Sequence, residues 1–433
     1  MNHLEIDSVS LNKVHAPHDR YNLGYFTFLM LGVGILQPWN SLIESLDFFK
    51  AHLPDHNVDF VVSIVSNGPL LLAQVTVILL HNYFKAVPTI ILSLVVMTIL
   101  SILMPIFPHI NDDQDSNWII IFILILIISI FNGIMHAWWF GLVGPFPQNC
   151  IASISTGWAV SGLSISIARA VSLLVFPTND DPNDSNHFKG AMLYFWLGAI
   201  ASVLSICLLL TLTKTEFFIY YRNKSSIIES ENQFRSDYTS SSPVDTNSIK
   251  GINTRHERNH SLAKTPSLKK IYNDVFWLGW GLVVLYIQTF LVFPAVMLKG
   301  HISFIKNESW QVWFIITLYN ITDTISRFLT ERWMILTTPT TILATLIRFI
   351  FIAFAFLSAY EVPIFSNDFV KMINLLMIGF TNGYIGNWQV IIACKKALYH
   401  EKELTSKFMS FFLALGILLG SIITSFGVKK LFV

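Results

Sequence analysis

The sequence predicts an all-α, polytopic membrane protein with eleven transmembrane helices, and two observations carry this prediction. Only 13% of the 433 residues are charged and 53% are hydrophobic, whereas about 25% of the residues in a soluble domain are charged. The hydrophobic residues also fall into blocks of about 20 residues, the length that a helix needs to cross the hydrocarbon core of a bilayer. Because lipid cannot satisfy backbone polar groups, these blocks must be helical.

The blocks form two groups, six before a long polar segment and five after it. The first group comprises residues 23–46, 58–83, 87–107, 118–143, 149–176 and 188–218. The second group comprises residues 275–298, 310–332, 339–360, 369–394 and 405–428. We therefore expect a six-helix bundle within residues 1–218, which starts with a short polar N-terminus, and a five-helix bundle within residues 271–433.

Residues 219–270 separate the two bundles. This segment is rich in Ser, Asn, Lys, Arg and Glu, lacks apolar periodicity, and contains Pro243 and Gly251, which would interrupt a helix. Its composition is typical of a mostly disordered linker.

The distribution of charge near the span ends predicts the orientation. Basic residues gather in the 219–270 linker and in the loop after residue 394, whereas acidic residues gather around 112–115 and 180–184, in loops of the opposite parity. Lys and Arg favour cytoplasmic loops, so we expect a cytoplasmic N-terminus and an extracytoplasmic C-terminus. Lys429 and Lys430 run against this assignment but do not outweigh the two basic segments.

Two ionisable residues lie within the span 310–332. Asp323 and Arg327 are four residues apart, so they share a helix face and can pair. An ionisable side chain near the middle of a membrane costs about 2.5–3.5 kcal/mol on insertion scales, and it therefore needs a partner or a purpose. The pair is either a structural clamp between helices or part of a polar cavity in which it binds a ligand.

Arg348 lies near the middle of the span 339–360, with no carboxylate near it in sequence. It needs a partner on another helix or an aqueous path, and Asp323 is the partner that we hypothesise. A structural clamp and a ligand-binding role both remain open for Arg348.

Asn132 and His136 are also four residues apart, in the span 118–143. A buried neutral histidine that bonds a neighbouring helix is one interpretation, and a cavity-facing histidine that contacts a ligand or carries a proton is the other.

In the first span, Pro38 removes one backbone hydrogen bond and bends the helix beside Trp39 and Asn40. A tryptophan there either fills space or stacks on a flat ligand. The adjoining kink and amide favour the ligand.

Five motifs resemble one family when they are taken together and in order. They are LGVGILQPWNSLIESLDFF in the first span, FPAV at Phe293–Val296, YNITDTISRFLT around Asp323, FTNGYIG at Phe380–Gly386 and FFLALGILLGS at Phe411–Ser421. This set, which is spread over nearly the whole chain, resembles the equilibrative nucleoside transporters.

The resemblance implies a six-plus-five bundle related to the major facilitator fold, with a substrate site between the halves and transport by alternating access. It implies that Trp39 contacts the nucleobase or gates the cavity, that Asp323 and Arg327 hold the ribose side, and that Arg348 matches the arginine of the ninth helix. His136 stands where the family often has glutamine. A proton-coupled symporter therefore stays open beside facilitated diffusion.

The expected function is thus transport of nucleosides or nucleobases, with a channel or receptor on a similar bundle as a remote alternative. The sequence has no phosphate-binding glycine loop, paired metal-ligand motif or nucleophile elbow, so we expect no enzyme activity, no cofactor and no metal. The lipid bilayer is the expected partner, and a net charge of +1 gives no argument for nucleic acid. We expect a monomer, a point that the sequence leaves open, and the plasma membrane rather than an internal one.

Overall fold

Helices make up all the regular secondary structure of the described residues. The structure is a computed structural model, and it describes residues 17–45, 48–49, 53, 58–80, 83–107, 113–177, 185–224, 268–293, 295–333 and 335–428. Most of the 219–270 segment, which the sequence predicts to be a linker, lies outside these residues, as does most of the polar N-terminus.

The helices follow the predicted hydrophobic blocks. The first group is α1 (Leu23–Glu44), α3 (Val58–Leu79), α4 (Ala86–Leu103), α5 (Gln114–Val143), α6 (Gln148–Val175) and α7 (Ser185–Leu212), with a 3-10 turn, η1 (Arg20–Asn22), before α1. The second group is α10 (Leu268–Val292), α11 (Ala295–Lys299), α12 (Glu308–Arg332), α13 (Thr338–Ile347), α14 (Phe349–Ala359), α15 (Asp368–Lys396) and α16 (Lys402–Ile423), with η3 (Tyr399–Glu401) before α16 and η4 (Thr424–Val428) after it.

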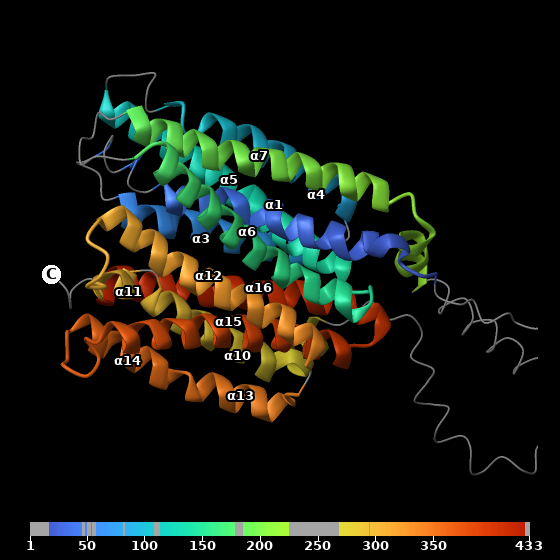
Figure 1. The fold of residues 1–433 in the computed structure, drawn as a ribbon. Helices are drawn as coiled ribbons and strands as arrows, with labels where there is room; N and C mark the ends of the chain where they lie inside the picture. The colour runs from blue at the N-terminus through green and yellow to red at the C-terminus, as the bar shows by residue number, and fades with distance from the viewer. Residues whose placement is uncertain are drawn as a thin grey trace, which may run out of the picture.

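The two groups pack as two layers, and the helix axes of both layers are roughly aligned (Figure 1). Within the first group, α1 packs on α6 and α7, and α5 packs on α3 and α4. Within the second group, α10 packs on α16 and α12 packs on α15. The groups meet along two seams, where α6 lies against α12 and where α16 lies against α3 and α5.

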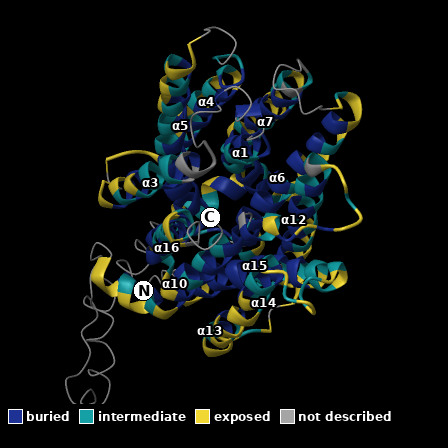
Figure 2. Cartoon of the chain, turned by 90° about the vertical axis from the view of Figure 1, so that its left-hand side faces the viewer, coloured by how far each residue is buried: buried dark blue, intermediate teal, exposed yellow. Residues whose placement is uncertain are grey.

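Eight helices of the described residues are long and apolar enough to cross a membrane, namely α1, α4, α5, α6, α7, α10, the α13–α14 pair and α16. In α3, α12 and α15, polar side chains such as Gln74, Asp323 and Asn387 point into the protein and are buried. The α13–α14 pair shows the opposite arrangement, because it lies at the outside of the bundle and most of its side chains are exposed or half-buried (Figure 2).

Small residues set the distance between α10 and α16. A Cβ added at Gly416 would come within 2.7 Å of the Val283 carbonyl oxygen, and one at Gly420 would come within 2.8 Å of the Phe290 Cβ. Gly416 and Gly420 therefore allow the close helix approach that their four-residue spacing predicts.

The span predicted at 339–360 is observed at Thr338–Ala359. It is built from two helices, α13 and α14, that meet at Arg348. Arg169 of α6 is buried, because it is only 7% exposed and donates a hydrogen bond of 2.6 Å to the Tyr194 hydroxyl of α7.

Candidate functional site

A cavity lies between the two groups of helices. Its volume is about 180 Å³, whereas one water molecule needs about 10–15 Å³, so the space suits a ligand or a cluster of waters. Residues of α1, α3, α5 and α6 line one side, and residues of α10, α12, α15 and α16 line the other. The cavity reaches Leu42, Met104 and Phe293, near the ends of α1, α4 and α10.

Five of the six candidate site residues come together around this cavity. Trp39 and Asn40 reach it from α1, His136 from α5, and Asp323 and Arg327 from α12. The sixth, Arg348, is not among the residues that line it.

Asp323 and Arg327 form a buried, two-pronged ion pair at the cavity wall. The Arg327 Nε donates to Oδ2 of Asp323 at 2.8 Å, and Nη2 donates to Oδ1 at 3.2 Å. The two residues are only 5% and 4% exposed. Bidentate geometry of this kind gives the strongest protein ion pairs, and here it presents both charges to the cavity.

Two neutral side chains extend this ion pair to neighbouring helices. The Asn382 amide nitrogen of α15 donates to Oδ1 of Asp323 at 2.8 Å, and the Thr289 hydroxyl of α10 donates to the Asn382 amide oxygen at 2.7 Å. Asp323, Arg327, Asn382 and Thr289 all line the cavity, and we call these four residues the α12 wall. Hydrogen bonds therefore join three helices of the second group around one carboxylate.

The opposite side of the cavity carries polar atoms that lack partners. His136 is 3% exposed and stacks on Trp158 with ring centroids 5.1 Å apart, yet neither of its ring nitrogens has a hydrogen-bond partner among the described residues. The same holds for the Asn132 amide oxygen and the Trp158 indole nitrogen. We call His136, Asn132 and Trp158, which all line the cavity, the α5–α6 wall.

Leaving a buried polar atom unpaired costs about 1–3 kcal/mol, so such atoms are rare and need an explanation. Water or a ligand in the adjoining cavity would provide the missing partners. The α5–α6 wall is thus ready to bond a molecule that enters.

Trp39 and Asn40 line the cavity beside Pro38. Trp39 is half-buried, so part of its ring remains free for contact. Asn40 is partly committed to the fold, because its amide nitrogen donates to the Ser161 hydroxyl of α6 at 2.9 Å.

Arg348 lies behind the α12 wall and is fully buried. Its guanidinium donates to the carbonyl oxygens of Leu285 and Ile378, at 2.9 and 3.2 Å, and to side-chain oxygens of Thr381 and Gln288. The hypothesised hydrogen bond with Asp323 is not formed, because these oxygens of α10 and α15 take up its donors. This arrangement favours the clamp interpretation of Arg348.

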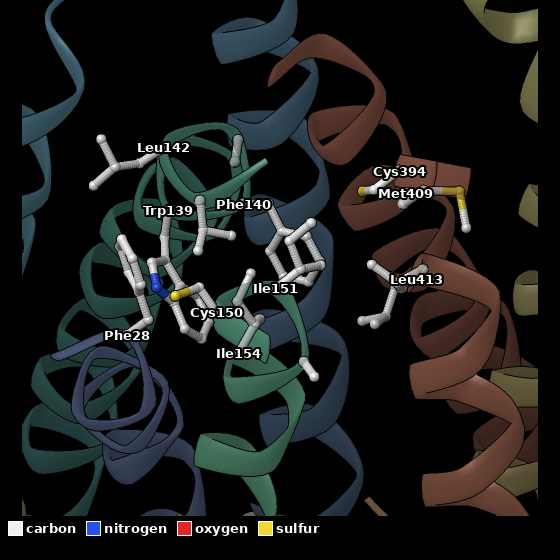
Figure 3. Packing of buried hydrophobic residues seen from close by; sticks show 14 of the residues in the cluster. Phe28, Trp139, Phe140, Leu142, Cys150, Ile151, Ile154, Cys394, Met409 and Leu413 are labelled. Carbon is white, nitrogen blue, oxygen red and sulfur yellow. The ribbon is translucent and has the colours of Figure 1, made fainter. Parts of the chain in front are cut away.

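The cavity is closed toward the end of the bundle where α5 finishes and α16 begins. Aromatic and apolar side chains of both groups form one core there, including Phe140 and Ile151 from the first group and Cys394 and Met409 from the second (Figure 3). Among the described residues, the apolar cluster beside Trp39 lies within the first group of helices and the cluster beside Phe293 lies within the second.

Charged residues reinforce this closed end. The Lys407 side chain of α16 is 0% exposed, and its ammonium lies 4.0 Å from the ring centre of Trp138 in α5. Lys407 also pairs with Glu403 at 2.9 Å, and Glu403 lies 3.4 Å from Arg222, which follows α7. This chain of contacts links the two groups of helices.

Sequence reasoning missed Asn382, Thr289 and Trp158 as parts of the site, and it named Asn132 only as a neighbour of His136. Asn382 belongs to the FTNGYIG motif, which was the available signal, but the sequence alone does not show which helix it faces. Neutral polar side chains also cost little in a membrane helix compared with charges, so nothing marks them as exceptional.

Comparison with known proteins agrees with this arrangement. The family described as "Nucleoside transporter" matches residues 122–429. The chain is 24% identical to human "Equilibrative nucleoside transporter 1", in an alignment that covers 94% of this chain and 97% of the relative. It is 23% identical to Arabidopsis thaliana "Equilibrative nucleotide transporter 1", with 95% and 88% covered.

Solved structures with a similar fold belong to transporters. The proton:xylose symporter XylE, of the major facilitator superfamily, superimposes with a TM-score of 0.62 at 10% identity, covering 96% of this chain and 90% of that one. The E. coli fucose:proton symporter FucP gives a TM-score of 0.57 at 13% identity, covering 94% and 96%. The fold therefore resembles that of these transporters. Since the family match extends over more than half of the residues, the chain belongs to the nucleoside transporter family.

Proposed function

We propose that this chain carries nucleosides or nucleobases across a membrane by facilitated diffusion, with the cavity between the two groups of helices as the substrate site. The observation that carries the proposal is that both groups supply polar side chains to one cavity. A site built from two halves can release its ligand when the halves move apart, as alternating access requires.

The α12 wall suits the sugar and the α5–α6 wall suits the base. The Asp323 carboxylate can accept a hydrogen bond from a ribose hydroxyl, and the Arg327 guanidinium can donate to an acceptor. The unpartnered nitrogens of His136 can accept from, or donate to, the polar edge of a base. Trp39 and Asn40 complete the site from α1, with Trp39 offering a ring face on which a flat base can stack.

The domain organisation follows from the same proposal. Residues 1–218 form a six-span half and residues 271–433 a five-span half, and residues 219–270 connect them in the cytoplasm. The chain crosses the plasma membrane eleven times, so that the N-terminus lies in the cytoplasm and the C-terminus lies on the opposite side. The core around Phe140 and the Lys407–Glu403–Arg222 chain then close the cytoplasmic side, so the structure represents a carrier whose inner gate is shut.

A proton-coupled symporter is the second candidate, because Asp323 and His136 are titratable groups that line the cavity. Uptake of labelled adenosine, uridine and hypoxanthine into proteoliposomes, with and without a pH gradient, separates the candidates. Facilitated diffusion predicts saturable uptake that a pH gradient does not drive uphill, whereas symport predicts accumulation and an inward current.

A counterflow measurement in the same vesicles separates a carrier from a channel. Unlabelled nucleoside on the far side should accelerate uptake through a carrier, because the loaded carrier reorients and returns. Unsaturable flux without acceleration would reject the carrier mechanism, and a chemically altered product would reject the proposal that the chain is not an enzyme.

A further inference from the structure

We propose that Asn382 is a positioning residue, which holds the Asp323 carboxylate with one acceptor site directed into the cavity. The inference rests on the proposed function, in which Asp323 accepts a hydrogen bond from the substrate. It explains how a carboxylate in a membrane protein can bind a neutral substrate without carrying a proton.

The chemistry of its neighbours determines the orientation of the Asn382 amide. An ionised carboxylate only accepts hydrogen bonds, so the amide nitrogen of Asn382 must face Asp323, 2.8 Å away. The amide oxygen then faces the Thr289 hydroxyl, which lies 2.7 Å away and must donate. The Thr289 hydroxyl also lies 3.0 Å from the Leu285 carbonyl oxygen, so its proton is shared between two acceptors. A flipped amide would place its oxygen against the Asp323 carboxylate and lose that hydrogen bond.

Close packing of α12 and α15 brings this short side chain within reach. A Cβ added at Gly383, the residue after Asn382, would come within 2.5 Å of the Asp323 carbonyl oxygen. The approach of the two helices at this point leaves no room for a longer path through water. The amide therefore bonds the carboxylate directly.

The donors around Asp323 leave about one acceptor site for a ligand. A carboxylate offers about four lone-pair sites. Arg327 uses one on each oxygen, and Asn382 uses a second on Oδ1. The remaining site is on Oδ2, and the residue lines the cavity.

Charged and titratable side chains surround Asp323. Arg327 and Tyr319 share its helix, Tyr286 of α10 lines the same cavity, and Arg348 lies behind the wall. Across the cavity stands His136 of α5. Among the described lining residues Asp323 is the only carboxylate.

The test is Asn382→Asp, because a protonated carboxyl has nearly the shape of the amide. When protonated, it donates its O–H to Asp323 and accepts from Thr289, as Asn382 does. When ionised, it places a second negative charge beside Asp323, and two such carboxylates share one proton over an extended pH range. The site is then intact in acid and disrupted at higher pH.

We expect uridine uptake by Asn382→Asp, per folded transporter, to approach the wild-type rate near pH 5. It should fall about tenfold below wild type near pH 8, since the loss of a charge-assisted hydrogen bond costs at least one factor of ten. Wild-type uptake should change less than about twofold over the same range. Asn382→Leu, which cannot donate at any pH, should stay low throughout.

Asn374→Asp is the matched control. Asn374 is a buried asparagine of the same helix, and its amide donates to the Phe351 carbonyl at 3.1 Å, away from the main cavity. Uptake per folded transporter by this variant should follow wild type at both pH values, so a general effect of an added carboxylate on α15 is excluded.

Two outcomes would overturn the inference. Asn382→Asp that follows wild type at every pH would show that Asp323 does not depend on Asn382, and acid-stimulated wild-type uptake with an inward current would show that the cavity carboxylate titrates. If wild type takes up no nucleoside, the proposed function fails. The melting temperature in detergent then decides the positioning claim. The melting temperature of Asn382→Asp should equal that of wild type in acid and fall below it as pH rises. A difference between the two proteins that stays constant with pH would reject the claim.

Discussion

The two sides of the cavity satisfy their hydrogen bonds in opposite ways. On the α12 wall, Asp323, Arg327, Asn382 and Thr289 bond one another across three helices. On the α5–α6 wall, the ring nitrogens of His136 and the amide oxygen of Asn132 have no partner among the described residues.

The α12 wall is therefore preorganised before a ligand binds, whereas the α5–α6 wall has polar groups that only a ligand or water can pair. A closed network keeps its geometry when the cavity is empty, so it orients a ligand at little cost. Unpaired buried groups instead carry a penalty that a ligand removes. Substitutions on the α12 wall should thus harm transport and stability together, whereas substitutions on the α5–α6 wall should harm binding alone.

Asp323→Asn should have the largest effect. The substitution replaces one accepting oxygen by a donating NH2 group and leaves Arg327 without its counter-charge. The loss is about 1.5–3 kcal/mol for each charge-assisted hydrogen bond, or roughly ten- to hundredfold in uptake. Uptake of labelled uridine, normalised to folded transporter in the membrane, measures it. A variant that fails to fold would show that the pair is a structural clamp, and normal uptake would exclude Asp323 from the substrate site.

His136→Phe should have the next largest effect. Phenylalanine keeps the stacking on Trp158 but has no ring nitrogens, so the apparent KM for nucleosides should rise about three- to tenfold. The melting temperature should stay equal or increase, since two unpartnered buried atoms disappear. A lower melting temperature with unchanged KM would contradict this comparison, because it would show that His136 stabilises the fold and does not bind substrate.

Trp39→Ala should have a smaller effect. Loss of one aromatic contact is worth about 0.5–1.5 kcal/mol, which predicts a roughly two- to tenfold weaker apparent affinity for substrates that contain a base. Trp118→Ala is a suitable control, because Trp118 packs at the edge of the same apolar cluster as Trp39 but does not line the cavity. Equal losses in both variants would reduce Trp39 to a packing residue.

Arg348→Met should have the smallest effect on transport and a clear effect on stability. The guanidinium bonds α10 to α15 behind the α12 wall, so its removal should lower the melting temperature by several degrees, about what a loss of 1–3 kcal/mol produces. Uptake per folded transporter should stay within about twofold of wild type. Unchanged stability with abolished uptake would return Arg348 to the substrate site.

Much of this arrangement could be predicted from the sequence because lipid imposes strict rules. The helix predicted at residues 23–46 is observed as α1 (Leu23–Glu44), and the predicted 118–143 span lies within α5 (Gln114–Val143). Asp323 and Arg327 stood out because charges in a membrane helix need a reason, and both line the cavity.

The rest depends on contacts between distant segments. Arg348 stood out for the same reason as Asp323. The oxygens that accept its hydrogen bonds belong to Leu285, Ile378 and Thr381, and no sequence pattern reveals that these residues lie close to it. Asn382 and Thr289 raise no conflict with lipid, so only the packing of α15 on α12 and α10 shows that they act on Asp323.

The central claim is that a nucleoside binds between the α12 wall and the α5–α6 wall. A cryo-EM structure of the protein in nanodiscs with saturating uridine tests it most directly. We predict ligand density that contacts Asp323 on one side and His136 on the other. Well-resolved density for uridine elsewhere, with this cavity filled only by water, would contradict the account.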